Sequence, residues 1–546
     1  MSTVPLEARD RRFAWIAFCL VSAWFLSWAQ PSADVIDAEV AHQAARSLRR
    51  EGTLAMGDSP EARALVAHAE QAAPGASPLA RGADGRWRSW YAPGQAVLLA
   101  PLHLVGEGLA HVDPRPDSSG SARVVDGVVR SEWWPHAATS WANPLCAGAL
   151  AGLAYLVARR LGASRGSSAW AVVGLCFASF LAPLARGQLS DVPAALFLCL
   201  GFERWLAARA GDPRALPWCG FALGLACATR VQLAPAAALL AASAAWSAPH
   251  RVAAAVRLVP GFAAGALLVA LANHARGGSP FDFGYASVFA GGFFARNPLE
   301  GAWLLVSSPG RGLWWSAPVL LPAVLGWWRW HARDATGAAA LFVAALLVAA
   351  PVCAMVAWHG AHAHGPRYVL ASVVLLAPCA ALCFDHAGAW ARRAWRAMLV
   401  AAAALQLCFL ATDAASWHAA AIEAQRRLAP ESGREGADPV VRDEALFQAA
   451  LVDWRTAAPT SVPRYALAQF AADAEGAIDA ERVFPAAGRA AYLPPERARH
   501  GRFLALVDAE AVGAARWPLA LLVALFLGVG AWLAARTLKE RAPTGR

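Results

Sequence analysis

Three carboxylates follow the first apolar run of the chain, which covers residues 13–29. The segment 31–39 reads Pro-Ser-Ala-Asp-Val-Ile-Asp-Ala-Glu and places acids at Asp34, Asp37 and Glu39. An acid in the first turn of a helix is stabilised by the helix dipole, and this is enough to explain Asp34. Asp37 lies beyond that turn. The sequence leaves two interpretations of it open: a structural acid, or a general base held at a membrane surface.

A further acid and three arginines lie in later polar connections between apolar runs. Asp191 directly follows Ser190, which is a suitable helix cap, so a structural role for this acid also stays open. Arg311 and Arg367 stand beside glycines at the start of apolar runs, and Arg230 lies in a short connection. Arginine binds phosphate oxygens through a bidentate fork, and glycine lets a backbone approach a ligand closely. The alternative is interfacial arginine that reaches toward lipid headgroups. Taken with the acids, the three arginines predict a phosphate or pyrophosphate site.

Polar side chains near these arginines are the expected lining of a substrate cleft. Clustered histidines are common zinc ligands, but the histidine spacing here matches no strict motif. We therefore assign no metal or other cofactor, although the sequence leaves a divalent metal open. Tyr368 is grouped with the donor-binding arginines because it follows Arg367 directly. The predicted cleft lining is Asp34, Tyr285, His359, His362 and His364.

The composition excludes an ordinary soluble enzyme. Hydrophobic residues make up 58% of the 546 residues and charged residues only 16%. Many apolar runs approach the ~20 residues that a spanning helix needs, so we predict an all-α polytopic membrane protein. The net charge of +10 comes from arginines in short connections, a pattern that indicates membrane lipids and not nucleic acid as partners. All ten cysteines fall inside apolar runs, which argues against a disulfide framework.

Counting crossings predicts about twelve membrane helices with both termini in the cytoplasm. One apolar run too many lies between the outer segment 30–91 and the basic connection 159–165. The run 92–111 is the weaker candidate, because Pro93 and Pro101 interrupt it, and we expect it to lie in the outer interface. The expected crossings are 13–29, 142–158, 167–186, 190–207, 217–229, 231–246, 257–274, 312–330, 337–357, 367–385, 395–412 and 517–535.

This topology divides the chain into three parts. A transmembrane catalytic module covers 1–412 and includes the first external loop 30–91 and the interfacial segment 92–111. A charged, proline-containing region at 413–516 is long enough for a small external α-rich domain. The last membrane helix and a cytoplasmic tail cover 517–546.

The order of the motifs resembles the GT-C superfamily of polytopic glycosyltransferases, especially its protein O-mannosyltransferase and aminoarabinose-transferase-like branch. Each motif is short, and it is their order and topology over residues 12–385 that carry the resemblance. The matching motifs are Asp37-Ala38-Glu39, Tyr91-Ala92-Pro93-Gly94, Ser190-Asp191-Val192-Pro193, Ser308-Pro309-Gly310-Arg311-Gly312 and Gly365-Pro366-Arg367-Tyr368.

The resemblance implies transfer of a sugar from a polyprenyl-phosphate donor to a hydroxyl of a glycan, lipid or protein acceptor. The reaction would invert the anomeric centre at the periplasmic face of a bacterial inner membrane. The family's two catalytic acids fall on Asp37 and Asp191. Its usual adjacent acid pair is separated here by Ala38, and on a helix this spacing points Asp37 and Glu39 in different directions.

The expected chemistry assigns the base to Asp37, and Asp191 and Glu39 are the other catalytic candidates. Arg230, Arg311 and Arg367 would stabilise the departing phosphate. Two other classes of function remain: a transporter or flippase of lipid-linked saccharides without catalysis, and a non-catalytic assembly protein. The donor sugar and the acceptor are not encoded in any motif of the chain.

Overall fold

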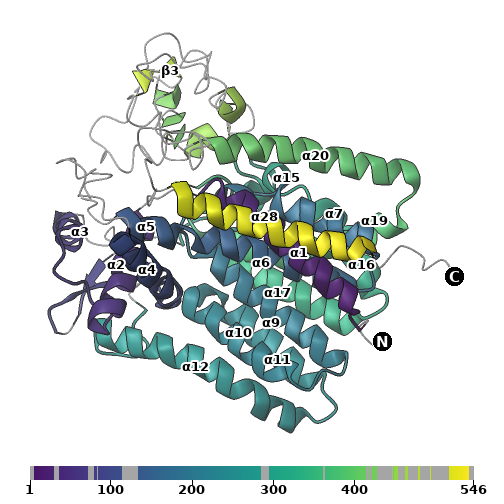
Figure 1. The fold of residues 1–546 in the computed structure, drawn as a ribbon, viewed down its shortest axis with the longest axis horizontal. Coiled ribbons are helices and arrows are strands. Elements are labelled where there is room, and N and C mark those ends of the chain that lie inside the picture. Colours follow the sequence, from purple (N-terminus) through teal and green to yellow (C-terminus); the bar gives the residue numbers. More distant parts are fainter. Residues whose placement is uncertain are drawn as a thin grey trace.

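The computed structural model describes residues 5–29, 36–71, 79–82, 84–112, 133–283, 294–360, 363–412 and 516–539, with short pieces between 417 and 493. Long helices run side by side and form one bundle (Figure 1). α1 (Ala8–Leu26) begins and α28 (Arg516–Lys539) ends at the same end of the bundle, which we call the termini end. A separate group of helices and a strand pair cover the opposite end, which we call the cap end. The cap consists of α2 (Ile36–Glu51), α3 (Pro60–Gln71), β1 (Leu79–Arg81), β2 (Trp87–Ser89), α4 (Gly94–Val112) and α5 (Trp133–Ser140).

The bundle contains the apolar elements expected of a membrane protein. Within the described residues, six helices are long and apolar enough to cross a membrane: 134–160, 251–277, 335–354, 367–386, 389–411 and 520–537. This confirms a multi-pass helical protein, while the number of about twelve crossings remains a prediction. The first half of the bundle contains α1 (Ala8–Leu26), α6 (Ala142–Arg160), α7 (Arg165–Cys176), α8 (Leu181–Arg186), α9 (Asp191–Arg209), α10 (Ala215–Thr229), η1 (Val231–Leu233), α11 (Ala234–Trp246) and α12 (Arg251–Gly277).

The second half of the bundle packs against the first and is closed by the last helix of the chain. α28 lies beside α1, and the rings of Phe18 and Phe526 are 5.4 Å apart. The elements are α14 (Pro298–Ser307), α15 (Leu313–Ser316), α16 (Leu320–His331), α17 (Ala335–Ala354), η2 (Arg367–Val369), α18 (Leu370–Leu376), η3 (Ala377–Cys379), α19 (Ala380–His386), α20 (Ala389–Ala411) and α28 (Arg516–Lys539).

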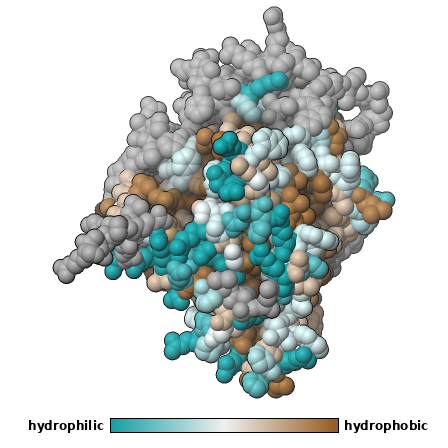
Figure 2. Space-filling model, turned by 90° about the vertical axis from the view of Figure 1, so that its right-hand side faces the viewer, coloured by the Kyte–Doolittle hydropathy of each residue, from teal (hydrophilic) through white to brown (hydrophobic). Residues whose placement is uncertain are grey.

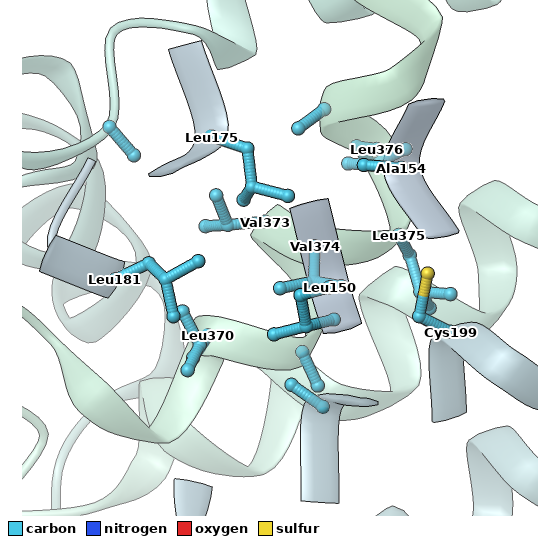
Figure 3. Close-up of a cluster of buried hydrophobic side chains, with 14 of the residues drawn as sticks. Leu150, Ala154, Leu175, Leu181, Cys199, Leu370, Val373, Val374, Leu375 and Leu376 are labelled. Carbon is cyan, nitrogen blue, oxygen red and sulfur yellow. The ribbon is translucent and has the colours of Figure 1, made fainter. Parts of the chain in front are cut away.

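The centre of the bundle is a continuous apolar core (Figure 3). Leu150 of α6, Leu175 of α7, Leu181 of α8 and Val373 of α18 converge there and are fully buried. Small residues bring other helices together. A Cβ added at Gly224 of α10 would lie 2.7 Å from a backbone oxygen of α12. Such close approach is typical of helices that pack without a hydrophobic driving force from water.

Two predicted crossings are broken helices, so the expected spans 167–186 and 312–330 are wrong as single helices. The first divides into α7 and α8, and the second into α15 and α16. The breaks meet, because the Phe180 N–H donates to the Ser316 carbonyl at 2.8 Å. Pro318 also cannot donate within a helix. Backbone groups freed inside a membrane need partners from the protein, and these two breaks supply one to each other.

The described structure is mostly helical, as predicted, and two short antiparallel strand pairs are local exceptions. β1 pairs with β2 inside the first predicted loop. In the region 413–516, β3 (Ile478–Asp479) pairs with β4 (Tyr492–Leu493), and the α-rich character of that region stays a prediction. The first loop is therefore a folded cap of helices and strands.

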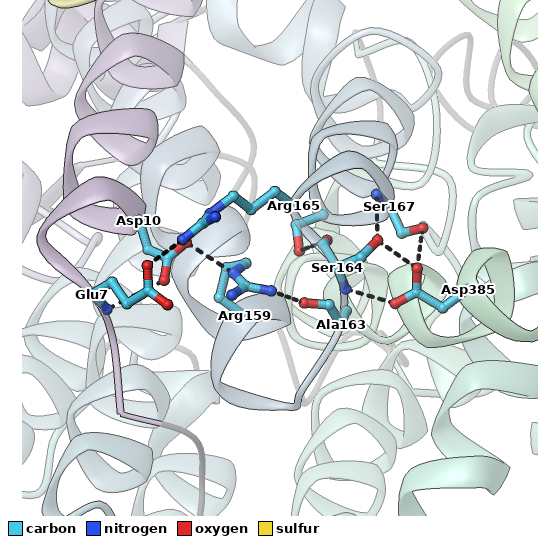
Figure 4. Close-up of polar contacts among 9 residues, drawn as sticks. Glu7, Asp10, Arg159, Ala163, Ser164, Arg165, Ser167 and Asp385 are labelled. Atoms are coloured by element: carbon cyan, nitrogen blue, oxygen red, sulfur yellow. Dashed lines mark hydrogen bonds and ion pairs between the residues drawn. The ribbon is translucent and has the colours of Figure 1, made fainter. Parts of the chain in front are cut away.

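Polar contacts join α1, the α6–α7 connection and α19 at the termini end of the bundle (Figure 4). Asp10 of α1 is buried and accepts hydrogen bonds from Arg159 at 3.0 Å and from Arg165 at 2.9 Å. Asp385 accepts from the Ser164 N–H at 2.6 Å, which ties α19 to the α6–α7 connection. Hydrophilic side chains gather on this face, between apolar flanks (Figure 2). This arrangement agrees with the predicted basic side of a membrane protein.

α4 corresponds to the predicted interfacial segment 92–111, and its contacts favour a position in the cap. Its first residue, Gly94, lies so close to the end of α10 that a Cβ would be 2.6 Å from the Ala228 carbonyl carbon. A Cβ at Gly106, near its other end, would be 2.5 Å from the Cα of Pro135 in α5. Both ends of α4 thus contact the cap end.

We predict that cysteines introduced at Val97 and Val112 react with a membrane-impermeant maleimide from the same, external side of intact cells. The two positions are 37% and 71% exposed, so both are accessible to the reagent. The parent protein, whose native cysteines are buried or half-buried, is the control. If Val112→Cys reacts only after permeabilisation, α4 crosses the membrane and the topology is wrong.

Candidate active site

The first candidate acid, Asp37, joins three distant segments at the cap end. It is the second residue of α2 and therefore lies in the first turn of this helix, so the prediction that Asp37 lies beyond the first turn is wrong. Its Oδ1 accepts a hydrogen bond from the Tyr91 hydroxyl at 2.5 Å, and its Oδ2 accepts from Arg367 Nη2 at 3.1 Å. Tyr91 lies between β2 and α4, and Arg367 begins η2. The carboxylate is half-buried, so it remains reachable from outside the protein.

The second candidate acid, Asp191, lies on the other side of the same arginine. It is the first residue of α9 and is buried. Its Oδ1 accepts from Arg230 Nη1, and its Oδ2 is 4.0 Å from Arg367 Nη1. Arg367 therefore lies between the two carboxylates, and one guanidinium bridges the start of α2 and the start of α9.

Aromatic and amide groups hold the two arginines in place. The Tyr368 ring centroid is 5.2 Å from Arg230 Cζ and 5.0 Å from Arg367 Cζ, within the range of cation–π attraction. When the Gln232 amide is oriented by its hydrogen-bond network, its oxygen accepts from Arg230 Nη2 at 2.8 Å and Nε at 2.9 Å. The structure thus brings together five predicted site residues in one cluster, which we call the Arg367 cluster: Asp37, Asp191, Arg230, Arg367 and Tyr368.

Two glycines shape the connection that leads to Arg367. Gly360 and Gly365 have φ of +76° and +84°, which side chains rarely adopt. A Cβ at Gly360 would lie 2.6 Å from Arg367 Cγ. Arg311 supports this connection through a hydrogen bond to its backbone. Its side chain is fully buried, and its Nη1 donates to the His359 carbonyl at 2.5 Å. Arg311 is thereby placed to hold the backbone that carries Arg367.

The predicted histidines do not gather at one point. His359 is buried against Trp358, with ring centroids 6.0 Å apart. His364 stacks on Phe409 of α20 at 5.1 Å. Among the residues that the structure describes, no group of three or more His, Cys, Asp or Glu has metal-binding geometry. Three predicted lining residues lie outside the described residues: Asp34, Tyr285 and His362.

Glu39 faces away from the Arg367 cluster, into the cap. It is buried, and its carboxylate contacts His136 Nε2 at 3.0 and 3.2 Å and Gln43 Nε2 at 2.8 Å. Burial alone raises the pKa of Glu39, but the charge and hydrogen bond of His136, together with the hydrogen bond from Gln43, hold that pKa well below its usual range. The side chain is therefore a carboxylate at neutral pH. Burial lowers the pKa of His42, which stays neutral beside this pair.

Sequence reasoning missed the role of several polar residues that the tertiary structure places around the two acids. Tyr91 appeared only within a family-like motif, and its bond to Asp37 was not predicted. Gln188 precedes Asp191 by three positions, accepts from the Gln95 amide through its carbonyl, and donates to the His136 carbonyl at 3.3 Å. The available signal was the polarity of Gln188 and Gln95 beside apolar runs.

Comparisons with known proteins give a structural likeness and no sequence match. No protein-family model and no curated protein shows a significant match to the chain. The crystal structure of ArnT from Cupriavidus metallidurans bound to undecaprenyl phosphate is similar over 96% of this chain and 78% of that chain, with 14% identity and a TM-score of 0.43. The apo structure of the same protein is similar over 93% and 75%, with 14% identity and a TM-score of 0.44.

We predict that Asp191 and Arg230 are energetically coupled. Removing one partner of a buried ion pair leaves an uncompensated charge, so Asp191→Asn and Arg230→Gln each destabilise the fold. The double variant should lose less than the sum of the two, with an interaction energy on the order of 1 kcal/mol or more. The measurement is SDS-induced unfolding in mild detergent.

The exposed pair Asp58 and Arg63, 3.5 Å apart, is the matched control. Exposed ion pairs contribute little, so the same cycle there should give additive effects. Additive effects at Asp191 and Arg230 would show that the cluster does not act as a unit.

Proposed function

We propose that this chain is a membrane glycosyltransferase that moves a sugar from a polyprenyl-phosphate donor to an acceptor hydroxyl at the cap end. The observation that carries the proposal is the Arg367 cluster. It combines an accessible carboxylate with two arginines at one end of an apolar bundle. In bacteria this end would face the periplasm, opposite the basic termini end.

The chemistry needs two kinds of group, and the cluster contains both. A carrier phosphate is already a leaving group, and its departure is helped by cations placed where negative charge develops. Arg367 and Arg230 supply these cations. The two carboxylates and two guanidiniums of the cluster balance one another. An incoming phosphate would therefore compete with Asp37 and Asp191 for the guanidiniums.

That exchange frees the base. When phosphate takes over Arg367 Nη2, Asp37 Oδ2 loses its partner and becomes available to the acceptor hydroxyl, while Tyr91 still holds Oδ1. In the reaction the acceptor oxygen forms the new bond to the anomeric carbon, and the bond from that carbon to the phosphate oxygen breaks. The hydroxyl proton passes to Asp37, and the electron pair leaves with the phosphate. One such displacement inverts the anomeric centre.

We predict that Asp37→Asn lowers sugar transfer on the order of 10²–10⁴-fold, because asparagine keeps the shape but cannot accept the proton. The assay uses purified protein in lipid nanodiscs with a panel of undecaprenyl-phosphate-linked sugars: glucose, mannose, galactose, arabinose and N-acetylglucosamine. Release of undecaprenyl phosphate in the presence of a membrane-lipid and glycan extract is the readout.

The control variant is Asp58→Asn, an exposed acid in the same cap, which should keep the parent rate. Parent turnover that survives in Asp37→Asn would show that another group is the base. Binding of the panel without any turnover by the parent protein would favour a transporter or flippase of lipid-linked saccharides.

We predict that Arg367→Lys weakens undecaprenyl phosphate binding by about 10–100-fold, because hydrogen bonds to charged groups contribute about 1.5–3 kcal/mol and lysine lacks the fork. Arg311→Lys is the matched comparison. It should act through the Gly360 connection and weaken binding less, since Arg311 is buried behind it. Binding is measured by the concentration dependence of ligand-induced thermal stabilisation. Equal effects of the two variants would contradict the assignment of Arg367 to the phosphate.

A further inference from the structure

A chain of polar contacts inside the cap connects the two candidate acids by a route that avoids Arg367. Asp37 and Glu39 are two positions apart on α2, so they project from different faces of the helix. Asp37 contacts Tyr91 and Arg367, while Glu39 contacts His136 of α5. The proposed mechanism gives no role to Glu39, which is buried.

His136 continues the route toward Asp191. Its ring is held on one side by Glu39, and on a flat face by the His42 ring, with centroids 3.7 Å apart and an interplanar angle of 24°. Its backbone carbonyl accepts from Gln188 Nε2 at 3.3 Å. Gln188 belongs to the short connection between α8 and α9, and Asp191 begins α9 three residues later.

Side chains of α6 and α4 also donate hydrogen bonds to the backbone in and next to the α8–α9 connection. Asn143 of α6 donates to the carbonyls of Leu184 at 3.3 Å and Leu189 at 3.0 Å. Gln95 of α4 donates to the carbonyl of Gln188. The connection that carries Asp191 is therefore held by α4, α5 and α6, and α5 is itself held to α2 by the pair of Glu39 and His136.

We propose that Glu39 and His136 form a positioning pair, which fixes the base Asp37 relative to Asp191 while Arg367 is engaged by the donor phosphate. The proposal rests on the proposed function and deepens it. Arg367 is the direct bridge between the acids in the free protein, and it must release Asp37 when phosphate binds. The hydrogen bonds of the cap route join Glu39 to His136 and His136 to Gln188, so the release of Asp37 by Arg367 breaks none of them.

The experiment compares three variants of the full chain in lipid nanodiscs. Glu39→Ala removes the pair. Glu39→Gln keeps an oxygen that can accept from His136 Nε2. Glu107→Ala removes a different cap contact, the ion pair with Arg50 at 2.7 Å that joins α4 to the opposite end of α2. Glu107 also lies 3.7 Å from Arg49 and from His103, and none of these partners belongs to the hydrogen-bonded route to Gln188, so Glu107→Ala tests general loosening of the cap.

The first measurement is hydrogen exchange of peptides that cover residues 184–194, which needs no ligand. Glu39→Ala should raise exchange in this segment, whereas Glu107→Ala and Glu39→Gln should leave it near the parent level. Unchanged exchange in Glu39→Ala, or an equal rise in Glu107→Ala, overturns the coupling. This measurement tests the coupling even if the parent protein shows no transferase activity. Absence of activity would contradict only the proposed function.

The second measurement is steady-state transfer with the panel sugar that the parent turns over. Misplacement of a reacting group by about 1 Å can cost on the order of 100-fold in rate, so Glu39→Ala should lower kcat by up to that factor. Donor KM should change little, because Arg230 and Arg367 remain, and Glu39→Gln should recover most of the lost rate. A Glu39→Ala protein with a lower melting temperature and the parent kcat would assign Glu39 a purely structural role and refute the proposal.

Discussion

The placement of one guanidinium, that of Arg367, is the constraint around which the cap end is arranged. A charge buried in a low-dielectric site is costly unless it is paired, and Arg367 is paired with Asp37 and lies 4.0 Å from Asp191. Because the two acids begin different helices, this one side chain determines how α2 and α9 approach each other. Tyr368 covers both arginines, and the left-handed Gly360 leaves the space that Arg367 occupies.

The membrane environment explains the form of the elements that support this site. Helices cross an apolar medium without difficulty, but every break in a helix exposes backbone groups that need partners. The breaks at Phe180 and Ser316 are adjacent and share a hydrogen bond. The same segment packs beneath the site, since a Cβ at Gly365 would lie 2.5 Å from Phe180 Cβ. The irregular backbone of the bundle is thus covered by protein.

The cap differs from the bundle in how it is stabilised. Its helix α2 has an apolar side formed by Val40, Ala41, Ala44 and Ala45, and these residues pack in a small core with α4. Its buried polar residues are Glu39, His42, Gln43 and Ser47. Buried polar groups stabilise a unique arrangement when they are fully paired and disfavour alternatives in which they are not. A cap built in this way can hold a reacting group at a defined position, which an apolar core of interchangeable alanines would do less well.

The sequence by itself determined the class of protein, the local direction of side chains and the identity of the main charged groups. Apolar length and low charge predicted a multi-pass helical protein, and helical spacing predicted that Asp37 and Glu39 diverge. Both properties depend on residues close together in the chain. The contacts that define the site join residues far apart, 54 positions for Tyr91 with Asp37 and 330 positions for Arg367 with Asp37. Only the tertiary structure decided that Arg230 reaches Asp191, that Arg311 lies behind the Gly360 connection, and that two apolar runs are broken helices. Each depends on which distant backbone or side chain completes a hydrogen bond, and periodicity along the sequence contains no information about that partner.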